Sequence, residues 1–428
     1  MENRLHVGID FSRDRADVCL LSPEGETIVR HRTFRNSPSG YAMARELITQ
    51  TLETHGYQAL DISAEATANY WMPYYWQFDA DLAGYDCHLF VLEPRWVRWY
   101  KHCHSEDHKR DRTDPFYIAD RTRALGNCIP WHADLHGWRL RTFTRLRFHL
   151  TQALIHEKGF LRTHLFLWAS GYVQEPPLSD IFGHTSRAIL ARSGLWSQLD
   201  TLSDDEVAAC LDQLSRHRLR DPRATAAKLR QAHRNSFRPP PELEEPLQEI
   251  WDLGIDHVSC LEALIDRLDK DIAREAQAYP GARCLATIPG FGLVLASGIA
   301  AEIGNLQRFR TPLKPDRRGG CRPRNLRDVE DAVAKFAGLW WPESSSGDFV
   351  AEERRLSKRG NRYLRYHLIL GADTLRRYVP KYQEFYARKH REANRHKHWR
   401  ALVLTARQSV GLIVGLLHRN EPWRSEEG

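Results

Sequence analysis

The sequence predicts an α/β domain at the N-terminus, a central region of long helices, and a mainly helical C-terminal region. Strand-like stretches recur up to residue 92, apolar residues then recur every three or four positions, and an apolar helix–turn–helix pattern follows residue 280. At roughly 150 residues per domain, 428 residues suffice for two or three such parts. We place the boundaries at 1–135, 136–280 and 281–428.

The N-terminal elements follow one another in a recognisable order. Strand patterns cover 5–10, 16–22, 26–33, 60–65 and 86–92, and helical patterns cover 38–55, a stretch after Asn69, and a stretch from Pro115 to about Leu125. The turn-like FSRDR between the first two strands indicates a hairpin. Three antiparallel strands followed by alternating helix and strand is the layout of the ribonuclease-H-like fold, which places ligands at the carboxyl ends of its strands.

Four acids stand where such a ligand site is expected. Asp10 and Glu65 end predicted strands, and Asp111 and Asp114 precede the last helix. Four converging carboxylates would hold two Mg²⁺ ions, since hard cations take oxygen ligands. Two such ions can activate an attacking oxygen and neutralise the leaving oxygen at a phosphodiester.

Each acid also has a purely structural interpretation. Asp10 can simply end a strand, Glu65 can be a lone polar residue, and Asp114 before Pro115 is a suitable helix N-cap. Taken together, however, two acids that end strands and a pair of acids that precedes a helix favour a metal site over four separate structural roles. In the preceding loop, zinc binding by His102, Cys103, His104 and His108 is a weaker alternative to a basic loop near a phosphate site.

A short helix before that loop interleaves cations and aromatic rings. It carries Arg95, Trp96, Arg98, Trp99 and Tyr100. Such a face can stack bases and contact phosphates, and it can equally pack inside the protein. The sequence leaves these two roles open.

The central region predicts two long amphipathic helices. Residues 140–172 and 241–278 have helical apolar spacing and can pair as an antiparallel coiled coil, which is usually a spacer or an oligomerisation element. Beyond them, 285–304 resembles a helix–hairpin–helix, whose Gly-rich turn brings backbone N–H groups to a phosphate; a tight turn that only packs is the alternative.

Basic residues and a serine cluster follow in the C-terminal third. Residues 308–327 predict a flexible basic loop that contacts nucleic acid. The candidate contacts are Arg317, Arg318, Arg322 and Arg324 in this loop, and Lys358, Arg359, Arg362 and Arg365 further on. Between them, Ser346 stands directly before a glycine; its hydroxyl is a nucleophile only when a base or metal activates it.

Composition narrows the class of protein. The net charge of +7 and the pI near 9.0 favour a polyanionic partner. Eight cysteines without a CxxC pair argue against a zinc ribbon or a disulfide scaffold and fit a reducing cytoplasm. We expect no export signal, because charges begin within a few residues, and no membrane span, because the apolar window 285–304 contains Pro289, four glycines and Glu302.

These motifs, in this order, resemble the IS110 class of bacterial insertion-sequence transposases, the RNA-guided bridge recombinases. The resemblance covers nearly the whole chain, through VGIDFSRDRADV, EAT, KRDRTDPFYIAD, TIPGFGLVLASGIAAEIG, AGLWW, SSSGDF, SKRGNRYLR and RALVLTARQSV. Two positions depart from the family pattern. Pro115 stands where an alanine is usual, and Ser345 stands where a glutamine is usual.

The resemblance implies a mechanism as well as a fold. It implies a RuvC-like domain with Asp10, Glu65, Asp111 and Asp114 as Mg²⁺ ligands, and a smaller transposase domain in which Ser346 attacks DNA. A phosphoserine link and a Holliday-junction-like intermediate would follow. The implied partners are donor and target DNA, a structured guide RNA, and further copies in a dimer or tetramer in the bacterial cytoplasm, at the nucleoid.

Three other functions compete with this one. A ribonuclease-H-like nuclease would use water and leave free ends without a covalent adduct. An ATP-binding protein of the sugar-kinase and actin kind shares the first loop, but no second phosphate motif follows a strand; DRRGGC lies in a basic loop. A non-catalytic nucleic-acid-binding protein would tolerate the loss of Asp10.

Overall fold

The computed structural model describes most of the chain, as two compact units. The described residues are 3–104, 113–126, 130–310, 314–315, 321–322, 324–342, 345–346, 349–350 and 355–424. One unit comprises 1–137, 303–372 and 381–421, and the other comprises 138–302, 373–380 and 422–428. The division into three domains stays a prediction.

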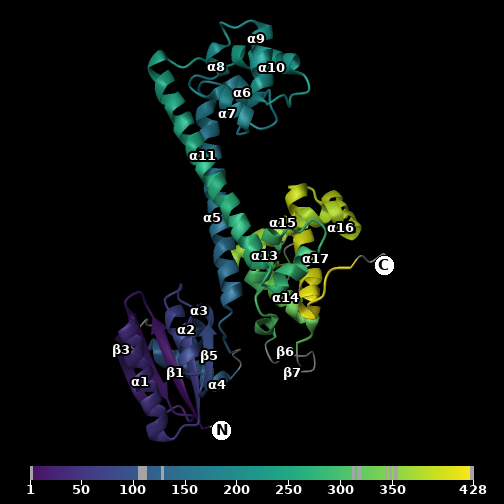
Figure 1. Cartoon of the computed structure of the whole chain (residues 1–428). Coiled ribbons are helices and arrows are strands. Elements are labelled where there is room, and N and C mark those ends of the chain that lie inside the picture. Colours follow the sequence, from purple (N-terminus) through teal and green to yellow (C-terminus); the bar gives the residue numbers. More distant parts are fainter. Residues whose placement is uncertain are drawn as a thin grey trace. The chain divides into compact units, whose positions relative to one another are not determined.

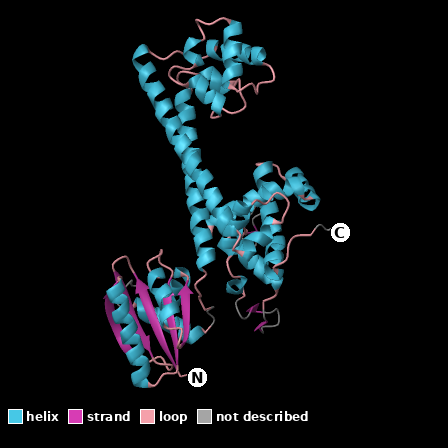
Figure 2. Ribbon diagram, viewed as in Figure 1, coloured by secondary structure: helices cyan, strands magenta, loops and turns pink. Residues whose placement is uncertain are grey.

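A five-stranded mixed sheet forms the centre of the N-terminal domain (Figures 1 and 2). Its strands are β1 (Arg4–Phe11), β2 (Arg15–Leu21), β3 (Thr27–Arg35), β4 (Ala59–Glu65) and β5 (Asp86–Leu92), in the order β3-β2-β1-β4-β5. The first three strands are antiparallel, and β1, β4 and β5 run parallel. The predicted α/β layout, with its three antiparallel strands first, is confirmed.

The parallel strands bring two of the predicted acids to one edge. Ile9 of β1 is in register with Ala64 of β4, so Asp10 and Glu65 are the next residues on neighbouring strands. Glu65 is in turn in register with Leu92 of β5. Both acids therefore leave the sheet at the carboxyl ends of its parallel strands, where ligands of open α/β sheets bind.

Helices pack on both faces of this sheet. Helix α4 (Asp114–Leu125) packs against β1, β2 and β4. Because side chains alternate along a strand, Phe11 faces away from the side that Gly8 presents to α4. On Phe11's side, α1 (Pro38–His55) and α2 (Met72–Asp81) contribute an aromatic cluster in which Tyr74 contacts Phe11 and Tyr41 edge to face.

Two long antiparallel helices run through the second unit. Helix α5 (Leu135–Leu165) and α11 (Pro241–Ala276) are joined by Arg139–Glu275 near one end and Lys158–Glu262 nearer the other, each at 2.7 Å. Both predicted helices are present, although the first ends at Leu165 rather than residue 172. Coiled-coil packing stays a prediction.

Five short helices form a small core around the far ends of this pair. They are α6 (Ser170–Gln174), α7 (His184–Leu190), α8 (Leu195–Gln198), α9 (Asp204–Leu214) and α10 (Pro222–Arg234). Buried Tyr172 contacts Trp196, and Trp168 contacts both Trp196 and Trp251 of α11, all edge to face. Burial of these large rings holds the group together.

The C-terminal region is mainly helical, as predicted. Its helices are α12 (Pro280–Ala286), α13 (Leu293–Ile303), the 3₁₀ turn η1 (Leu306–Phe309), α14 (Leu326–Phe336), α15 (Arg362–Tyr378), α16 (Pro380–Glu392) and α17 (Lys397–Arg419). Two small strand pairs interrupt them, β6 (Lys314–Pro315) with β7 (Cys321–Arg322) and β8 (Ser345–Ser346) with β9 (Phe349–Val350). The basic segment therefore contains a short antiparallel pairing, where we expected no regular structure.

The turn between α12 and α13 packs tightly against α15. Gly290 has φ +79°, and a Cβ there would lie 2.4 Å from Cγ2 of Thr374 and 2.6 Å from the ring of Tyr378. Glycine is thus required by packing as well as by backbone conformation. The phosphate-binding role of this turn stays a prediction.

One described helix is long and apolar enough to cross a membrane by length and composition alone. It is α17, with a window hydropathy of 1.5, of which 56% is buried inside the protein. Its buried side chains include Val410, Ile413 and Val414, and it packs against α14. This pattern is typical of the core helix of a folded domain.

Candidate active site

Three of the four predicted acids gather where β1, β4 and α4 meet. Asp10 is the next-to-last residue of β1, Glu65 is the last residue of β4, and Asp114 is the first residue of α4. Gly8 makes this approach possible, since a Cβ there would lie 1.9 Å from the carbonyl oxygen of Pro115. The glycine two residues before Asp10 therefore lets the N-terminal turn of α4 lie directly on β1.

The electrostatics of Asp10 show that these acids act on one another. Burial, followed by the charges of Asp114 and Glu65, raises the pKa of Asp10 from 3.8 to about 6. The nearby ammonium of Lys101 opposes this rise only in part. Like charges that share a poorly solvated site disfavour ionisation in just this way.

Lys101 supplies a counter-charge that the sequence did not reveal. It lies on α3 (Pro94–Cys103), and its Nζ is 2.5 Å from Oδ1 of Asp114, which is only 8% exposed. The alternative interpretation of Asp114 as a helix N-cap is wrong. Thr113 occupies the cap position and accepts the first helical hydrogen bond from the N–H of Tyr117, so the carboxylate of Asp114 is available for the ion pair.

A second acid of α4, also missed by sequence reasoning, joins α3 to α4. The hydroxyl of Tyr100 donates to Oδ2 of Asp120 at 2.7 Å, and Arg123 donates to Oδ1 of the same carboxylate at 2.6 Å. Asp120 is buried. A buried carboxylate satisfied on both oxygens holds the two helices in one arrangement, and this fixes Lys101 beside Asp114.

The donor set suits a hard divalent cation. Carboxylate oxygens are the ligands that Mg²⁺ prefers, and the mutual repulsion at Asp10 is what a bound cation relieves. Within the described part of the chain, no group of three or more His, Cys, Asp or Glu side chains lies close enough to hold a metal ion. Asp111, the fourth predicted ligand, lies outside the described residues, as does His108 of the zinc alternative.

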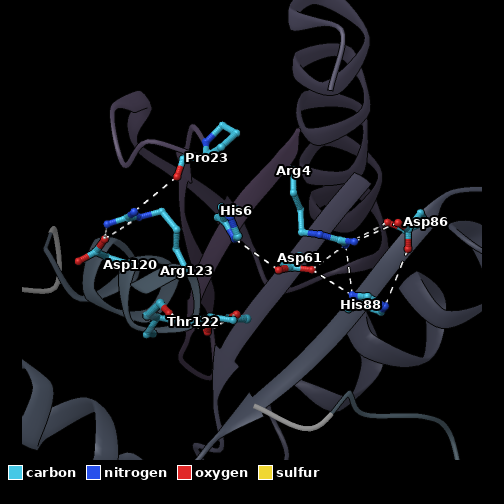
Figure 3. A network of polar contacts seen from close by, with 11 residues as sticks. Arg4, His6, Pro23, Asp61, Asp86, His88, Asp120, Thr122 and Arg123 are labelled. Carbon is cyan, nitrogen blue, oxygen red and sulfur yellow. Dashed lines mark hydrogen bonds and ion pairs between the residues drawn. The ribbon is translucent and has the colours of Figure 1, made fainter. Parts of the chain in front are cut away.

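A separate polar network lies at the opposite ends of the same parallel strands (Figure 3). Arg4 donates to Asp61 and to Asp86, each at 3.0 Å, and lies 3.2 Å from Nδ1 of His88. Burial, with Arg123 and Arg4 nearby, lowers the pKa of His6 to about 4, so His6 is neutral at pH 7. This network ties β1, β4 and β5 together at the end remote from Asp10.

The predicted C-terminal site residues are placed only in part. Ser346 lies on β8, paired with Phe349 of β9, and Arg322 lies on β7; only their backbones are described. Arg317 and Arg318 lie outside the described residues, and Arg324 lies just before α14. Their roles stay predictions.

The second group of predicted phosphate contacts surrounds the start of α15. Lys358 adopts φ +52°, Arg359 is exposed, and Arg362 donates to the hydroxyl of Tyr363 at 3.0 Å. Arg365 instead donates to the carbonyls of Ala337 and Lys358, at 3.0 and 2.9 Å, and burial lowers its pKa. Arg365 therefore has a structural role whether or not it also meets a phosphate.

Comparison with protein families decides the class. A family model described as a transposase matches residues 7–167, and the model of the Transposase IS116/IS110/IS902 family matches 282–314 and 322–387. The chain belongs to the IS110 class of transposases. The transposase is accordingly an enzyme that cleaves and joins DNA, and the first matched region contains all four predicted acids.

Individual relatives agree with this assignment. The transposase is 23% identical to an insertion element IS116 uncharacterized 44.8 kDa protein of Streptomyces clavuligerus, over 97% of this chain and 95% of that protein. It is 30% identical to a probable family 20 transposase of Pseudomonas aeruginosa, over 31% of this chain and 34% of that one. A solved structure of T. thermophilus RuvC in complex with a Holliday junction substrate aligns with 30% of this chain and 99% of its own, at 12% identity and a TM-score of 0.23.

Proposed function

We propose that the transposase recombines DNA through a covalent serine–DNA intermediate, with Asp10, Glu65, Asp111 and Asp114 as its Mg²⁺ ligands. The observation that supports this most directly is the raised pKa of Asp10, which reports three carboxylates crowded at one end of the sheet. A protein gains nothing in stability from such crowding. Carboxylates whose pKa is shifted by burial and by neighbouring charges are typical of functional sites.

The carboxylates and Lys101 set up the site before DNA enters. Bound Mg²⁺ would supply Lewis-acid stabilisation of the charge that develops on the scissile phosphate. Asp10 and Glu65 are held by neighbouring strands, and Asp114 by the first turn of α4, so their backbone positions are fixed before a cation binds. The ammonium of Lys101, 2.5 Å from Oδ1 of Asp114, holds that side chain in place.

Ser346 would perform the covalent step. Its Oγ forms a bond to phosphorus while one bridging P–O bond of the DNA backbone breaks, and the departing deoxyribose oxygen leaves as a hydroxyl. The serine proton passes by way of a base to the departing deoxyribose oxygen, and the energy of the phosphodiester is retained in the phosphoserine bond. A second DNA hydroxyl can then attack phosphorus, restore the serine and join the strands.

We further propose that a structured guide RNA selects the DNA. This part of the proposal rests on the family resemblance and on the basic character of residues 308–327. Pairing between RNA and DNA would read the sequence, while the protein contacts phosphates. The active assembly would contain two or four copies, in the cytoplasm at the nucleoid.

The decisive experiment is detection of the covalent adduct. Labelled DNA is incubated with protein, guide RNA and Mg²⁺ and separated by denaturing electrophoresis. We expect Ser346→Ala to abolish the adduct and recombination while DNA and RNA binding persist, because only the nucleophilic oxygen is removed. Asp10→Asn should abolish both cleavage and adduct.

Neighbouring residues provide matched controls. Ser345→Ala removes the adjacent hydroxyl of the same strand. Asp14→Asn removes an exposed acid near β1 that pairs with the adjacent Arg13. Both should leave the adduct nearly unchanged. DNA cleavage by the unaltered protein without any adduct would mean that water is the nucleophile, and an adduct lost only in Ser345→Ala would move the nucleophile by one residue.

A further inference from the structure

Helix α3 has one face in the domain core and one face in solvent. Val97 and Tyr100 are buried, whereas Trp96 is 53% exposed and Trp99 is 56% exposed. The two tryptophans are three residues apart, so they lie side by side on the helix surface. The sequence alone left open whether these rings pack internally, and within the described residues they do not.

The exposed face of α3 carries positive charge only. Residues 94–103 contain Arg95, Arg98 and Lys101 and no acid. Arg95 and Arg98 are exposed, and Arg95 bonds to Glu93 just before the helix. From α4, the guanidinium of Arg121 lies 5.9 Å from the centre of the Trp96 ring. Exposed indole rings can stack on nucleic-acid bases, and the guanidinium groups beside them can bind phosphates. The chemistry of this face therefore suits a nucleic acid.

This face adjoins the carboxylates. Lys101, on the same helix as both tryptophans, forms the ion pair with Asp114. Arg121, which touches Trp96, lies seven residues after Asp114 on α4, or about 10 Å at 1.5 Å per residue. A base stacked on Trp96 would therefore lie on the order of 10 Å from Asp114 along α4.

We propose that Trp96 and Trp99 form a stacking platform for unpaired DNA bases beside the scissile phosphate. The proposal rests on the proposed function, because strand exchange requires bases that have left their duplex. Such bases lose stacking energy when they separate, and aromatic side chains restore it without regard to sequence. Arg95 and Arg98 would contact the flanking phosphates.

Binding measurements with full-length protein test the platform. A fluorescent single-stranded oligonucleotide and a duplex of the same sequence are titrated at several salt concentrations. We expect Trp96→Leu plus Trp99→Leu to weaken single-strand binding roughly ten- to a hundredfold, because the stacking of bases on the two rings is lost. Duplex binding should change by less than about twofold. The dependence of affinity on salt should stay the same, because no phosphate contact is removed.

Two variants separate stacking from other roles. Trp96→Phe plus Trp99→Phe keeps aromatic rings and should retain most of the single-strand affinity. Phe237→Leu removes an aromatic ring that is 68% exposed on the other unit and should have no effect. Unchanged thermal unfolding of the leucine variant would confirm that its fold is intact.

The possible failures can be told apart. Equal weakening of single-strand and duplex binding, or unchanged single-strand binding, would overturn the platform. A shift in oligomeric state of the leucine variant by light scattering would assign the rings to contact with a second copy and also overturn it. Failure of the proposed function has a different signature, which is DNA cleavage by Asp10→Asn.

Discussion

Ionised Asp10 lowers the free energy of unfolding, so its effect on stability depends on pH. Its pKa is 3.8 ordinarily and about 6 in the folded protein, so the folded state binds its proton more tightly than the unfolded state. The free energy of unfolding therefore falls as pH rises from about 4 to about 6, by on the order of 2–3 kcal/mol, and the full cost persists above pH 6.

Asp10→Asn should remove this cost. Without divalent metal at pH 7.5, we expect the variant to unfold at a higher denaturant concentration than the unaltered protein, and the two to converge near pH 4. Chemical denaturation across this pH range measures the difference, with Asp14→Asn as the exposed control. A variant less stable at pH 7.5 would mean that Asp10 is not under electrostatic strain.

At the same scale, the sequence identified the acids but not their partners. Asp10 and Glu65 were predictable because each ends a strand-like stretch. Lys101 and Asp120 were not, because their roles depend on how α3 crosses α4, which no local pattern encodes. The Arg4–Asp61 pair likewise depends on the register between β1 and β4.

At the scale of elements, the contact between α4 and β1 decides whether Asp114 reaches Asp10. We expect Gly8→Ala to lower the free energy of unfolding by about 1–3 kcal/mol or more, as overpacking does. It should also abolish DNA cleavage, because the new methyl group would displace the backbone of Pro115. Gly84→Ala is the control, since a Cβ there meets nothing within 4 Å. Thermal unfolding and cleavage assays measure both effects, and a Gly8→Ala protein with normal activity would contradict this account of the site.

The basic segment at 308–327 is a second element with a testable role. Arg317→Ala plus Arg318→Ala should weaken nucleic-acid binding for all sequences alike and reduce the dependence of affinity on salt, since phosphate contacts release counterions. Titrations of two unrelated DNA sequences at several salt concentrations measure both quantities. A salt dependence equal to that of the unaltered protein would show that this segment does not contact the backbone.

Elements were the most predictable level of the structure. Alternating and helical apolar patterns located the five strands and most helices of the N-terminal domain to within a few residues, because one face of each is buried. The β6–β7 pair in the basic segment was missed, because strands of two residues leave no periodicity to detect. The end of α5 at Leu165 was missed because apolar residues continue beyond it into the short-helix core.

At the scale of the whole molecule, the order of motifs along the chain carried the most information. Each motif taken alone had a structural explanation, such as a strand end for Asp10 or a polar turn for Ser346. The family matches cover two regions, 7–167 and 282–387 with a short gap. The first region contains the four acids, and the second contains Ser346. Because the acids and the serine lie in different matched regions, the next question is which copies of the chain share one active site.

A mixed assembly answers that question. If the acids of one subunit act with the serine of another, an assembly of Asp10→Asn and Ser346→Ala subunits contains one site with both defects and one site with neither. Co-expression with two tags and tandem purification should then give roughly half of the adduct formed by the unaltered protein, by counting sites in a dimer. Each variant alone should give none. If every site drew its acids and serine from the same subunit, each site in the mixed assembly would carry one defect, and no adduct would form.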